Sequence, residues 1–209
     1  MKRAFDVFVA ATALVLLSPL MVIVALLVRV FLGKPVLFRQ TRPGLHGQPF
    51  EIIKFRSMCD EFDADGNEIP EAGRVGRFGR FIRTTSLDEL PELWNVLNGT
   101  MSLVGPRPLL MRYLDRYSSE QARRHDVEPG ITGLAQIGGR NAISWDEKFA
   151  LDVYYVDHHS FWMDLQILLK TAGKVLQREG IAADGSPSSP EFLGSMPSQG
   201  LEGPGRVGK

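Results

Sequence analysis

The sequence contains a single cysteine, Cys59, and only four histidines. One thiol excludes an internal disulfide bond and a cysteine-based zinc site, and it agrees with a reducing, cytoplasmic environment. No histidine stands in the H-E-x-x-H spacing of a zinc protease, and the neighbours His158 and His159 would diverge on a helix. The sequence therefore gives no support to a disulfide-stabilised protein or to a histidine-ligated metal site.

Net charge is missing as well. Lysine plus arginine and aspartate plus glutamate each number 24, so the formal net charge of zero gives no case for nucleic-acid binding. Charge is absent altogether from residues 7–28. An apolar run of this length is enough to cross a bilayer, which needs about 20 residues. No small-x-small cleavage site follows the run, which argues against a cleaved signal peptide.

The apolar run contains Ser18-Pro19 near its middle. A proline there removes a backbone hydrogen bond and clashes with the preceding turn. Lys2 and Arg3 precede the run, and basic residues mark the cytoplasmic side of a membrane segment. Basic residues also follow it, namely Arg29, Lys34, Arg39 and Arg42. We therefore predict a re-entrant helix over residues 1–34, broken at Ser18-Pro19, with both ends on one face. A spanning helix with a proline kink and a buried soluble helix are the alternatives.

The remaining sequence predicts one membrane-associated α/β domain over residues 35–180. Two β-like runs flank Pro43-Gly44 and predict a small hairpin. Residues 86–97 predict an amphipathic helix, and residues 144–178 are mainly helical, with an apolar face that suits either core packing or the bilayer interface. Residues 181–209 are rich in glycine, proline and serine, and predict a disordered tail.

Asp88-Glu89 stands at the start of the predicted amphipathic helix. Ser86 and Glu89 have the spacing of a capping box, in which both residues only stabilise the helix start. The chemical alternative is a carboxylate pair facing a phosphorylated substrate, since helix N-termini hold phosphate oxygens. Mg²⁺ would suppress the repulsion between the carboxylates and a diphosphate, because it needs only one or two carboxylates beside phosphate oxygens. Asp88 and Glu89 are thus candidate catalytic residues and Mg²⁺ ligands.

Basic side chains accompany this pair. Arginines recur at every third position from residue 74 to residue 83, along one stripe of a helix, and Arg80 and Arg83 lie nearest to Asp88 in sequence. Arg107 stands between two prolines, whose rings restrict the backbone and suit a fixed fork for phosphate. The other candidate phosphate contacts are Lys54, Arg56 and Arg140.

Taken in order, these segments resemble one family, the small monotopic phosphoglycosyl transferases of bacteria, which act on polyprenyl phosphate. The resemblance covers roughly residues 1–180, and its segments are 2–6 (KRAFD), 18–19 (SP), 39–44 (RQTRPG), 54–58 (KFRSM), 86–97 (SLDELPELWNVL), 105–108 (GPRP) and 129–133 (PGITG). Residues 139–145 and 151–156 are similar to the subgroup that includes the diacetylbacillosamine-phosphate transferase of N-glycosylation.

The resemblance implies a covalent mechanism in a catalytic domain over residues 35–180. Asp88 would attack the β-phosphorus of a UDP-sugar, an N-acetylated amino sugar in this subgroup, and release UMP. Polyprenyl (undecaprenyl) phosphate would then take the sugar phosphate from the acyl phosphate. Glu89 would assist through metal binding or proton handling, and Mg²⁺ and the arginines would neutralise charge.

The implied setting is the cytoplasmic face of the bacterial inner membrane. There the reaction would initiate glycoconjugate assembly in contact with membrane lipids and, in turn, with downstream glycosyltransferases. One alternative from a different class stays open. In it the chain is a non-enzymatic adaptor whose arginines bind acidic lipids, and Asp88-Glu89 only caps a helix.

Overall fold

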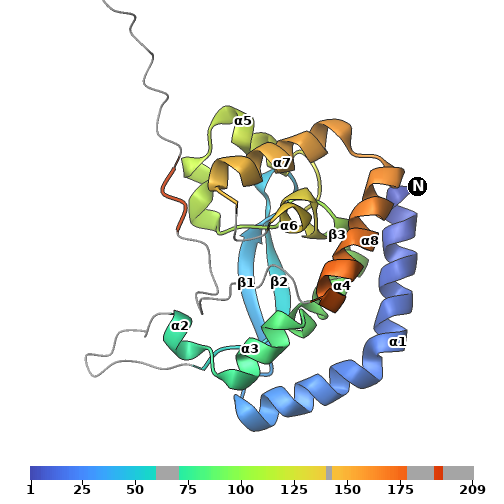
Figure 1. Ribbon diagram of the computed structural model, residues 1–209, viewed down its shortest axis with the longest axis vertical. Helices are drawn as coiled ribbons and strands as arrows, with labels where there is room; N and C mark the ends of the chain where they lie inside the picture. Colours follow the sequence, from blue (N-terminus) through green and yellow to red (C-terminus); the bar gives the residue numbers. More distant parts are fainter. Residues whose placement is uncertain (60–70, 140–142, 178–190, 195–209) are drawn as a thin grey trace, which may run out of the picture.

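The computed structural model describes residues 1–59, 71–139, 143–177 and 191–194. Two small sheets are surrounded by helices, and one long helix runs along the edge of the molecule (Figure 1). The mixed α/β class predicted from the sequence is confirmed. In chain order the helices and strands are α1 (Lys2–Phe31), β1 (Leu37–Pro43), β2 (Pro49–Phe55), α2 (Glu71–Arg74), α3 (Arg77–Thr84), α4 (Glu92–Asn98), β3 (Ser102–Val104), α5 (Ser119–Ala122), β4 (Gly130–Thr132), α6 (Leu134–Gly138), α7 (Trp145–His158) and α8 (Phe161–Gln177).

Helix α1 corrects one detail of the prediction. The helix continues through Pro19 without interruption, so it is not broken, and Figure 1 shows it bending into two arms. Pro19 has no N–H to donate to the carbonyl four residues earlier, that of Val15. The Ser18 hydroxyl donates to this same oxygen over 2.8 Å. Ser18 thereby satisfies the acceptor that Pro19 leaves unbonded, which explains why the pair permits a bend without ending the helix.

Both arms of α1 pack on the same domain. Ala10 on the first arm is fully buried in the main core, together with residues of α4, β3 and α8. Val24 and Val28 on the second arm are buried against Phe55 and Ile82. The opposite face stays open, with exposed apolar side chains that include Phe8, Val15, Leu16, Val22, Ile23, Leu26 and Val30. Within the described residues α1 alone has the length and composition to cross a membrane.

The predicted hairpin is confirmed. Strands β1 and β2 are antiparallel, and their register pairs Leu37 with Phe55 and Pro43 with Pro49. Asn95 fastens α4 to β2, because its side-chain oxygen accepts from the N–H of Ile53 (3.1 Å) and its amide donates to the carbonyl of Glu51 (2.7 Å). Asn95 is buried, so these bonds replace bonds to water. The result is that the start of α4 lies beside the end of β2.

A second, parallel pair of strands holds the 105–108 loop. Strand β3 pairs with β4, with Ser102 opposite Gly130 and Val104 opposite Thr132. The chain then passes so close to β4 that a Cβ on Gly130 would lie 2.0 Å from the backbone nitrogen of Gly105. Only glycine allows this approach, which fixes where the following Pro106-Arg107-Pro108 leaves the sheet.

The helical prediction for residues 144–178 holds with one interruption. Helix α7 begins at a capping box formed by Ser144 and ends at His158, and α8 runs from Phe161 to Gln177. Core packing of the apolar face is confirmed, and its placement at the bilayer interface stays a prediction. Phe149 and Val153 are buried in the core, whereas Phe161 and Trp162 are exposed.

Four residues of the tail, Glu191–Gly194, belong to the described part of the chain. The side chain of Phe192 is buried, with 3% exposure. The composition of residues 181–209 did not reveal that Phe192 has an aromatic pocket to occupy, and disorder of this tail stays a prediction. The rest of the predicted tail lies outside the described residues.

Candidate active site

The local structure around Asp88 differs from the predicted helix start. Ser86 has a left-handed backbone (φ 55°) and its side chain caps nothing. Residues 87–89 form a single 3-10 turn, and α4 begins only after Pro91. An N-cap residue needs an extended backbone, so the capping box predicted for Ser86 and Glu89 is wrong. Glu89 is thus released for other contacts.

Glu89 lies between two cations from distant segments. Lys54 at the end of β2 donates to Glu89 Oε1 over 3.1 Å. Arg107 from the Gly-Pro-Arg-Pro loop donates to the same oxygen through Nη2. Burial opposes ionisation of Glu89, but the charges of Arg107 and Lys54 outweigh it and hold the pKa of this carboxyl well below its usual range. The two cations thus favour the ionised form of Glu89.

Asp88 behaves in the opposite way. Its side chain is 92% covered, with 8% exposure, and burial raises its pKa to about 6, with a further contribution from the negative charge of Glu89. Lys54, Arg83 and Arg107 oppose the rise without cancelling it. No ion pair between described residues ends on Asp88. Asp88 is thus an ionisable carboxylate that lies close to cations but forms no ion pair with them.

Sequence reasoning missed a third carboxylate, Glu92. This residue on the first turn of α4 is 1% exposed, and its Oε1 lies 2.8 Å from Nζ of Lys54. Burial, together with the negative charge of Glu89, raises the pKa of Glu92 to about 7, against the opposing charges of Lys54 and Arg107. The spacing of three residues between Glu89 and Glu92 was the available signal, because it places both on one face of a helical turn.

Arg42 on β1 was also missed as a site residue. Burial lowers the pKa of Arg42 to about 10, with a further contribution from the nearby charge of Arg107. Its Nη2 donates to Gln40 over 2.5 Å, and the charge of Glu92 partly offsets that of Arg107 at its guanidinium. Arg42 stood in the sequence motif RQTRPG, but nothing local separated it from an ordinary strand arginine.

The other predicted phosphate contacts are placed differently. Gly79 lets α3 approach the hairpin end so closely that a Cβ there would lie 2.0 Å from the carbonyl oxygen of Ser57. This contact brings Arg83 to Ser57 (Nε to Oγ, 2.9 Å) and near Asp88. Arg80 on the same helix is exposed beside a shallow hollow.

Arg56 and Arg140 are the remaining residues that were predicted to contact phosphate. Arg56 is buried and donates to the carbonyl oxygens of Lys34 (2.6 Å) and Met58 (3.0 Å), so it ties the end of the hairpin to the segment after α1. Arg140 lies outside the described residues. The structure thus gathers Asp88, Glu89, Lys54, Arg83 and Arg107, and it gives Arg56 structural contacts.

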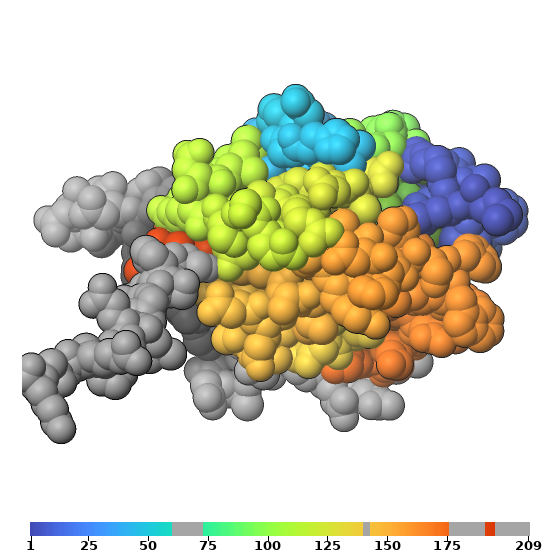
Figure 2. All heavy atoms as spheres, turned by 90° about the horizontal axis from the view of Figure 1, so that it is seen from above, coloured from blue at the N-terminus to red at the C-terminus, as the bar shows by residue number. Residues whose placement is uncertain are grey.

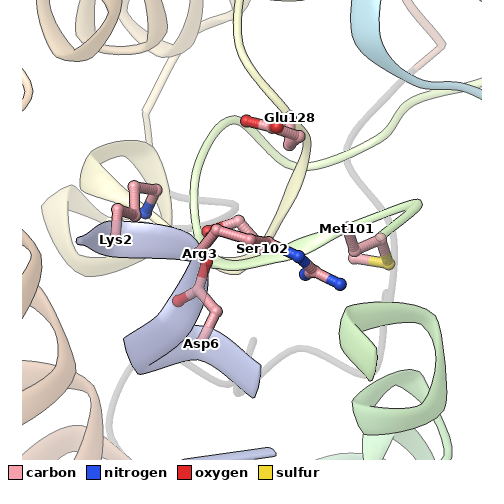
Figure 3. A pocket seen from close by; sticks show the side chains of 6 residues that line it. All are labelled: Lys2, Arg3, Asp6, Met101, Ser102 and Glu128. Carbon is pink, nitrogen blue, oxygen red and sulfur yellow. Dashed lines mark hydrogen bonds between the residues drawn. The ribbon is translucent and has the colours of Figure 1, made fainter. Parts of the chain in front are cut away.

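A separate polar cluster surrounds the start of α1. Lys2, Arg3 and Asp6 from α1 face Ser102 and Glu128 around a cavity of about 140 Å³ (Figure 3). Lys2 pairs with Asp164 of α8 (2.7 Å), and Arg3 donates to the last carbonyls of α4. Buried Asp6 accepts from Ser102 over 2.7 Å. These bonds anchor the first arm of α1 to the domain, away from Asp88.

The carboxylates suit a metal only in combination with a substrate. The described residues contain no group of three or more histidine, cysteine, aspartate or glutamate side chains arranged to hold a metal ion. Burial is the main cause of the raised pKa of Asp88, and the negative charge of Glu89 adds to it, so the two carboxylates repel each other. That environment fits Mg²⁺ bound through one or two carboxylates, with phosphate oxygens completing its shell.

Comparisons with known proteins identify relatives of the chain. Residues 1–178 match the family of bacterial sugar transferases. The chain is 54% identical over 195 residues to the uncharacterized sugar transferase EpsL of Bacillus subtilis, covering 93% of this chain and 96% of that protein. It is 44% identical over 188 residues to the UDP-glucose:undecaprenyl-phosphate glucose-1-phosphate transferase of Caulobacter vibrioides, covering 84% of this chain and 69% of that protein.

A third relative shows another donor sugar and a different length. It is the UDP-N-acetylgalactosamine-undecaprenyl-phosphate N-acetylgalactosaminephosphotransferase of Aeromonas hydrophila, 40% identical over 183 residues. The alignment covers 84% of this chain and 43% of that protein. The chain therefore spans nearly the whole Bacillus protein but less than half of the Aeromonas one.

Proposed function

Because the chain belongs to the family of bacterial sugar transferases and is a phosphoglycosyl transferase, we propose that it transfers a sugar-1-phosphate from a UDP-sugar to undecaprenyl phosphate and releases UMP. The observation that carries the mechanism is the position of Asp88, which is nearly buried beside three cations and held by none of them in an ion pair. A nucleophilic carboxylate needs this combination of charge stabilisation and an unoccupied oxygen.

The proposed reaction has two steps. An Asp88 carboxylate oxygen forms a bond to the β-phosphorus of the donor, and the bond from that phosphorus to the bridging oxygen breaks, so UMP leaves with the electron pair. An oxygen of undecaprenyl phosphate next attacks the same phosphorus of the acyl phosphate. The Asp88–phosphorus bond breaks, which regenerates the carboxylate and gives undecaprenyl-diphosphate-sugar. The product is the kind of lipid-linked sugar that further glycosyltransferases extend.

The neighbouring side chains divide the work. Arg107 and Lys54 stabilise the charge that develops on the transferred phosphoryl group, and Arg83 adds a third cation. The low pKa of Glu89 favours an electrostatic and metal-binding role over proton handling, since the two cations favour its ionised form. Asp88 and Glu89 would hold Mg²⁺, which when bound neutralises negative charge on the diphosphate.

The donor we propose is a UDP-linked N-acetylated amino sugar, with diacetylbacillosamine as one candidate. Support comes from the resemblance of residues 139–145 and 151–156 to the bacillosamine subgroup. By their names, the Aeromonas relative uses an N-acetylated sugar and the Caulobacter relative uses glucose. UDP-glucose is therefore the matched competitor in any donor panel.

The two anchors of α1 support a re-entrant position on the cytoplasmic face of the inner membrane. Lys2 at one end pairs with Asp164, and Val28 at the other end packs on the hairpin and α3. One domain holds both ends, whereas a spanning helix would carry Lys2 to the opposite side of the bilayer from that domain. The exposed apolar face of the bent helix would lie in lipid, at the depth of the undecaprenyl phosphate headgroup.

Asp88→Asn tests the nucleophile. We expect UMP release to fall by at least about 10⁴-fold, because the amide cannot form the acyl phosphate, while membrane association is retained. Mass spectrometry of wild-type enzyme incubated with donor alone should find a phosphosugar on the peptide that carries Asp88. The exposed Asp115→Asn is the matched control and should retain activity. Normal turnover by Asp88→Asn would exclude the covalent route, and no UMP release by wild type with any donor would favour the adaptor alternative.

Single-cysteine labelling tests the topology. In a Cys59→Ser background, a cysteine at position 1 and one at position 34 should react with an impermeant reagent from the same side of sealed vesicles. Labelling from opposite sides would establish a spanning helix.

A further inference from the structure

The segment Glu191–Gly194 lies beyond the family match, which ends at residue 178, yet it is seated in the domain. The Phe192 ring occupies an aromatic pocket, with ring centroids 4.9 Å from Phe149, 5.7 Å from Tyr113 and Trp145, and 5.8 Å from Tyr117. In Figures 1 and 2 this short red segment lies at the edge of the molecule against the yellow-green region.

The domain contacts the backbone and both side chains of Glu191-Phe192. Arg116 donates to the carbonyl oxygen of Phe192 over 2.5 Å, and the N–H of Phe192 donates to the Tyr113 hydroxyl over 3.3 Å. Glu191 pairs with Arg116 (2.8 Å) and Arg112 (3.2 Å). A buried aromatic anchor, a matched charge and paired backbone groups are the elements of peptide recognition. The pocket therefore recognises an acidic residue followed by phenylalanine.

A short chain of contacts joins this pocket to the active site. Tyr117 stacks on Phe192, with an interplanar angle of 22°. The Tyr117 hydroxyl accepts from Arg124 (3.3 Å), and another nitrogen of Arg124 donates to the backbone carbonyl of Arg107 (2.8 Å). Buried Asp152 fixes Arg124 from the other side. Phe192 is thus two side chains away from the backbone of the residue that binds Glu89.

We propose that Glu191-Phe192 is an intramolecular ligand whose seating in the aromatic pocket positions Arg107 for the donor diphosphate. This role rests on the proposed function of Arg107 in sugar-phosphate transfer. Phe192 touches no reacting atom, so it is a positioning residue. Without its ring, Tyr113, Tyr117 and Phe149 would lose a packing partner and relax partly into the void, because protein interiors are close-packed. Tyr117 would move in this relaxation, and Arg124 with it.

The kinetic test uses full-length Phe192→Ala with UDP-sugar as the varied substrate. We expect kcat/KM for UMP release to fall by about 10- to 100-fold, the loss that an ångström-scale misplacement produces. Phe192→Tyr, which keeps the ring, should recover most of the activity. Leu193→Ala is the matched control, since its side chain is 81% exposed and should leave activity unchanged. If Phe192→Ala had wild-type kinetics, the proposal would be overturned. Faster turnover would also overturn it, because it would show that the seated segment inhibits the enzyme.

Charge reversal provides a variant that removes no core volume. Glu191→Arg should lower kcat/KM, and the double variant Glu191→Arg with Arg116→Glu should restore part of it by re-forming the pair in reverse. If the double variant is no better than the single one, the ion pair does not seat the segment.

A binding measurement separates this proposal from the proposed function. With the exposed Trp94 and Trp162 changed to phenylalanine, Trp145 reports on the pocket, since its ring lies 5.7 Å from Phe192. We expect Phe192→Ala to shift its emission, and a synthetic peptide of residues 188–195 to reverse the shift and raise UMP release. A reversed shift without recovered activity in an enzyme whose wild type is active would contradict positioning of Arg107. An inactive wild type with normal peptide binding would instead contradict the proposed function.

Discussion

Two buried charge clusters in this protein contain similar groups but pair them differently. In the first, Arg124 and Asp152 have side chains that are 2% and 4% exposed and lie 2.7 Å apart. The other donors of Arg124 reach Tyr117 and the carbonyl of Arg107. In the second, Asp88, Glu89 and Glu92 share Lys54 and Arg107, with the Lys54 ammonium between Glu89 and Glu92.

The difference separates a structural ion pair from a reactive one. Burial raises the pKa of Asp152 and of Asp88 alike. Arg124 donates two hydrogen bonds to Asp152. Near Asp88, by contrast, Lys54 and Arg107 form their ion pairs with Glu89. In the proposed mechanism, this leaves an Asp88 oxygen to bond to phosphorus or to a metal ion. We therefore assign the reaction to the cluster in which a carboxylate has no ion-pair partner among the described residues, and a structural role to the Arg124–Asp152 pair.

The largest effect that we expect on stability comes from breaking the paired cluster. Arg124→Met should destabilise the protein by about 3–5 kcal/mol, because it leaves Asp152 buried without a partner. Denaturant unfolding in detergent, followed by tryptophan emission, measures this loss. The double variant Arg124→Met with Asp152→Leu should recover most of it, since two apolar groups replace the pair. A double variant as unstable as the single one would show that the cluster is more than an ion pair.

Removing one cation from the reactive cluster should act on catalysis instead. Arg107→Ala should lower kcat/KM for UMP release by about 10²–10³-fold, the usual cost of losing one group that stabilises transition-state charge. Arg107→Lys should remain impaired, because lysine keeps the charge and loses the fork. Exposed Arg123→Ala is the control for arginine loss. A change of less than threefold in Arg107→Ala would remove this residue from the site.

Much of the scaffold followed from local pattern. The hairpin was predicted because turn residues separate two β-like runs, and α7 and α8 both fall within residues 144–178, which were predicted to be mainly helical. The shape of the Asp88 turn was not predictable from the capping-box pattern, because Ser86 adopts a left-handed backbone that the sequence alone does not require. Local rules describe a segment in isolation, and this turn is set by what packs around it.

The missed site residues have a common physical cause. Arg42 and Glu92 come from β1 and α4, and they join the cluster only because the hairpin, α4 and the 105–108 loop converge. Phe192 was missed for the same reason, since a single aromatic residue in a polar tail shows its partner only in three dimensions. Composition predicts how much a segment can bury, and not whether a pocket elsewhere fits one of its side chains.

The titration of Asp88 should change the rate and the stability in opposite directions. Asp88 must be ionised to attack, so kcat/KM for UMP release should fall about tenfold per pH unit below pH 6. Stability should change in the opposite direction. The folded pKa of Asp88 lies above its unfolded value of 3.8, so its contribution to stability is present below that value and is lost as the pH rises through about 6. A flat rate profile between pH 4 and pH 7 would contradict the nucleophile assignment.

The smallest effect that we expect comes from an exposed ion pair on the hairpin. Arg39 and Glu51 form a cross-strand ion pair at 3.1 Å, but their side chains are 57% and 60% exposed. Water and salt screen such a pair, so Glu51→Ala should change the free energy of unfolding by no more than about 0.5 kcal/mol and leave UMP release unaltered. Denaturant unfolding of Glu51→Ala and Arg124→Met at low and high salt measures the smallest and the largest expected losses of stability. If Glu51→Ala cost as much as Arg124→Met, burial would not be what separates a structural ion pair from a surface contact in this protein.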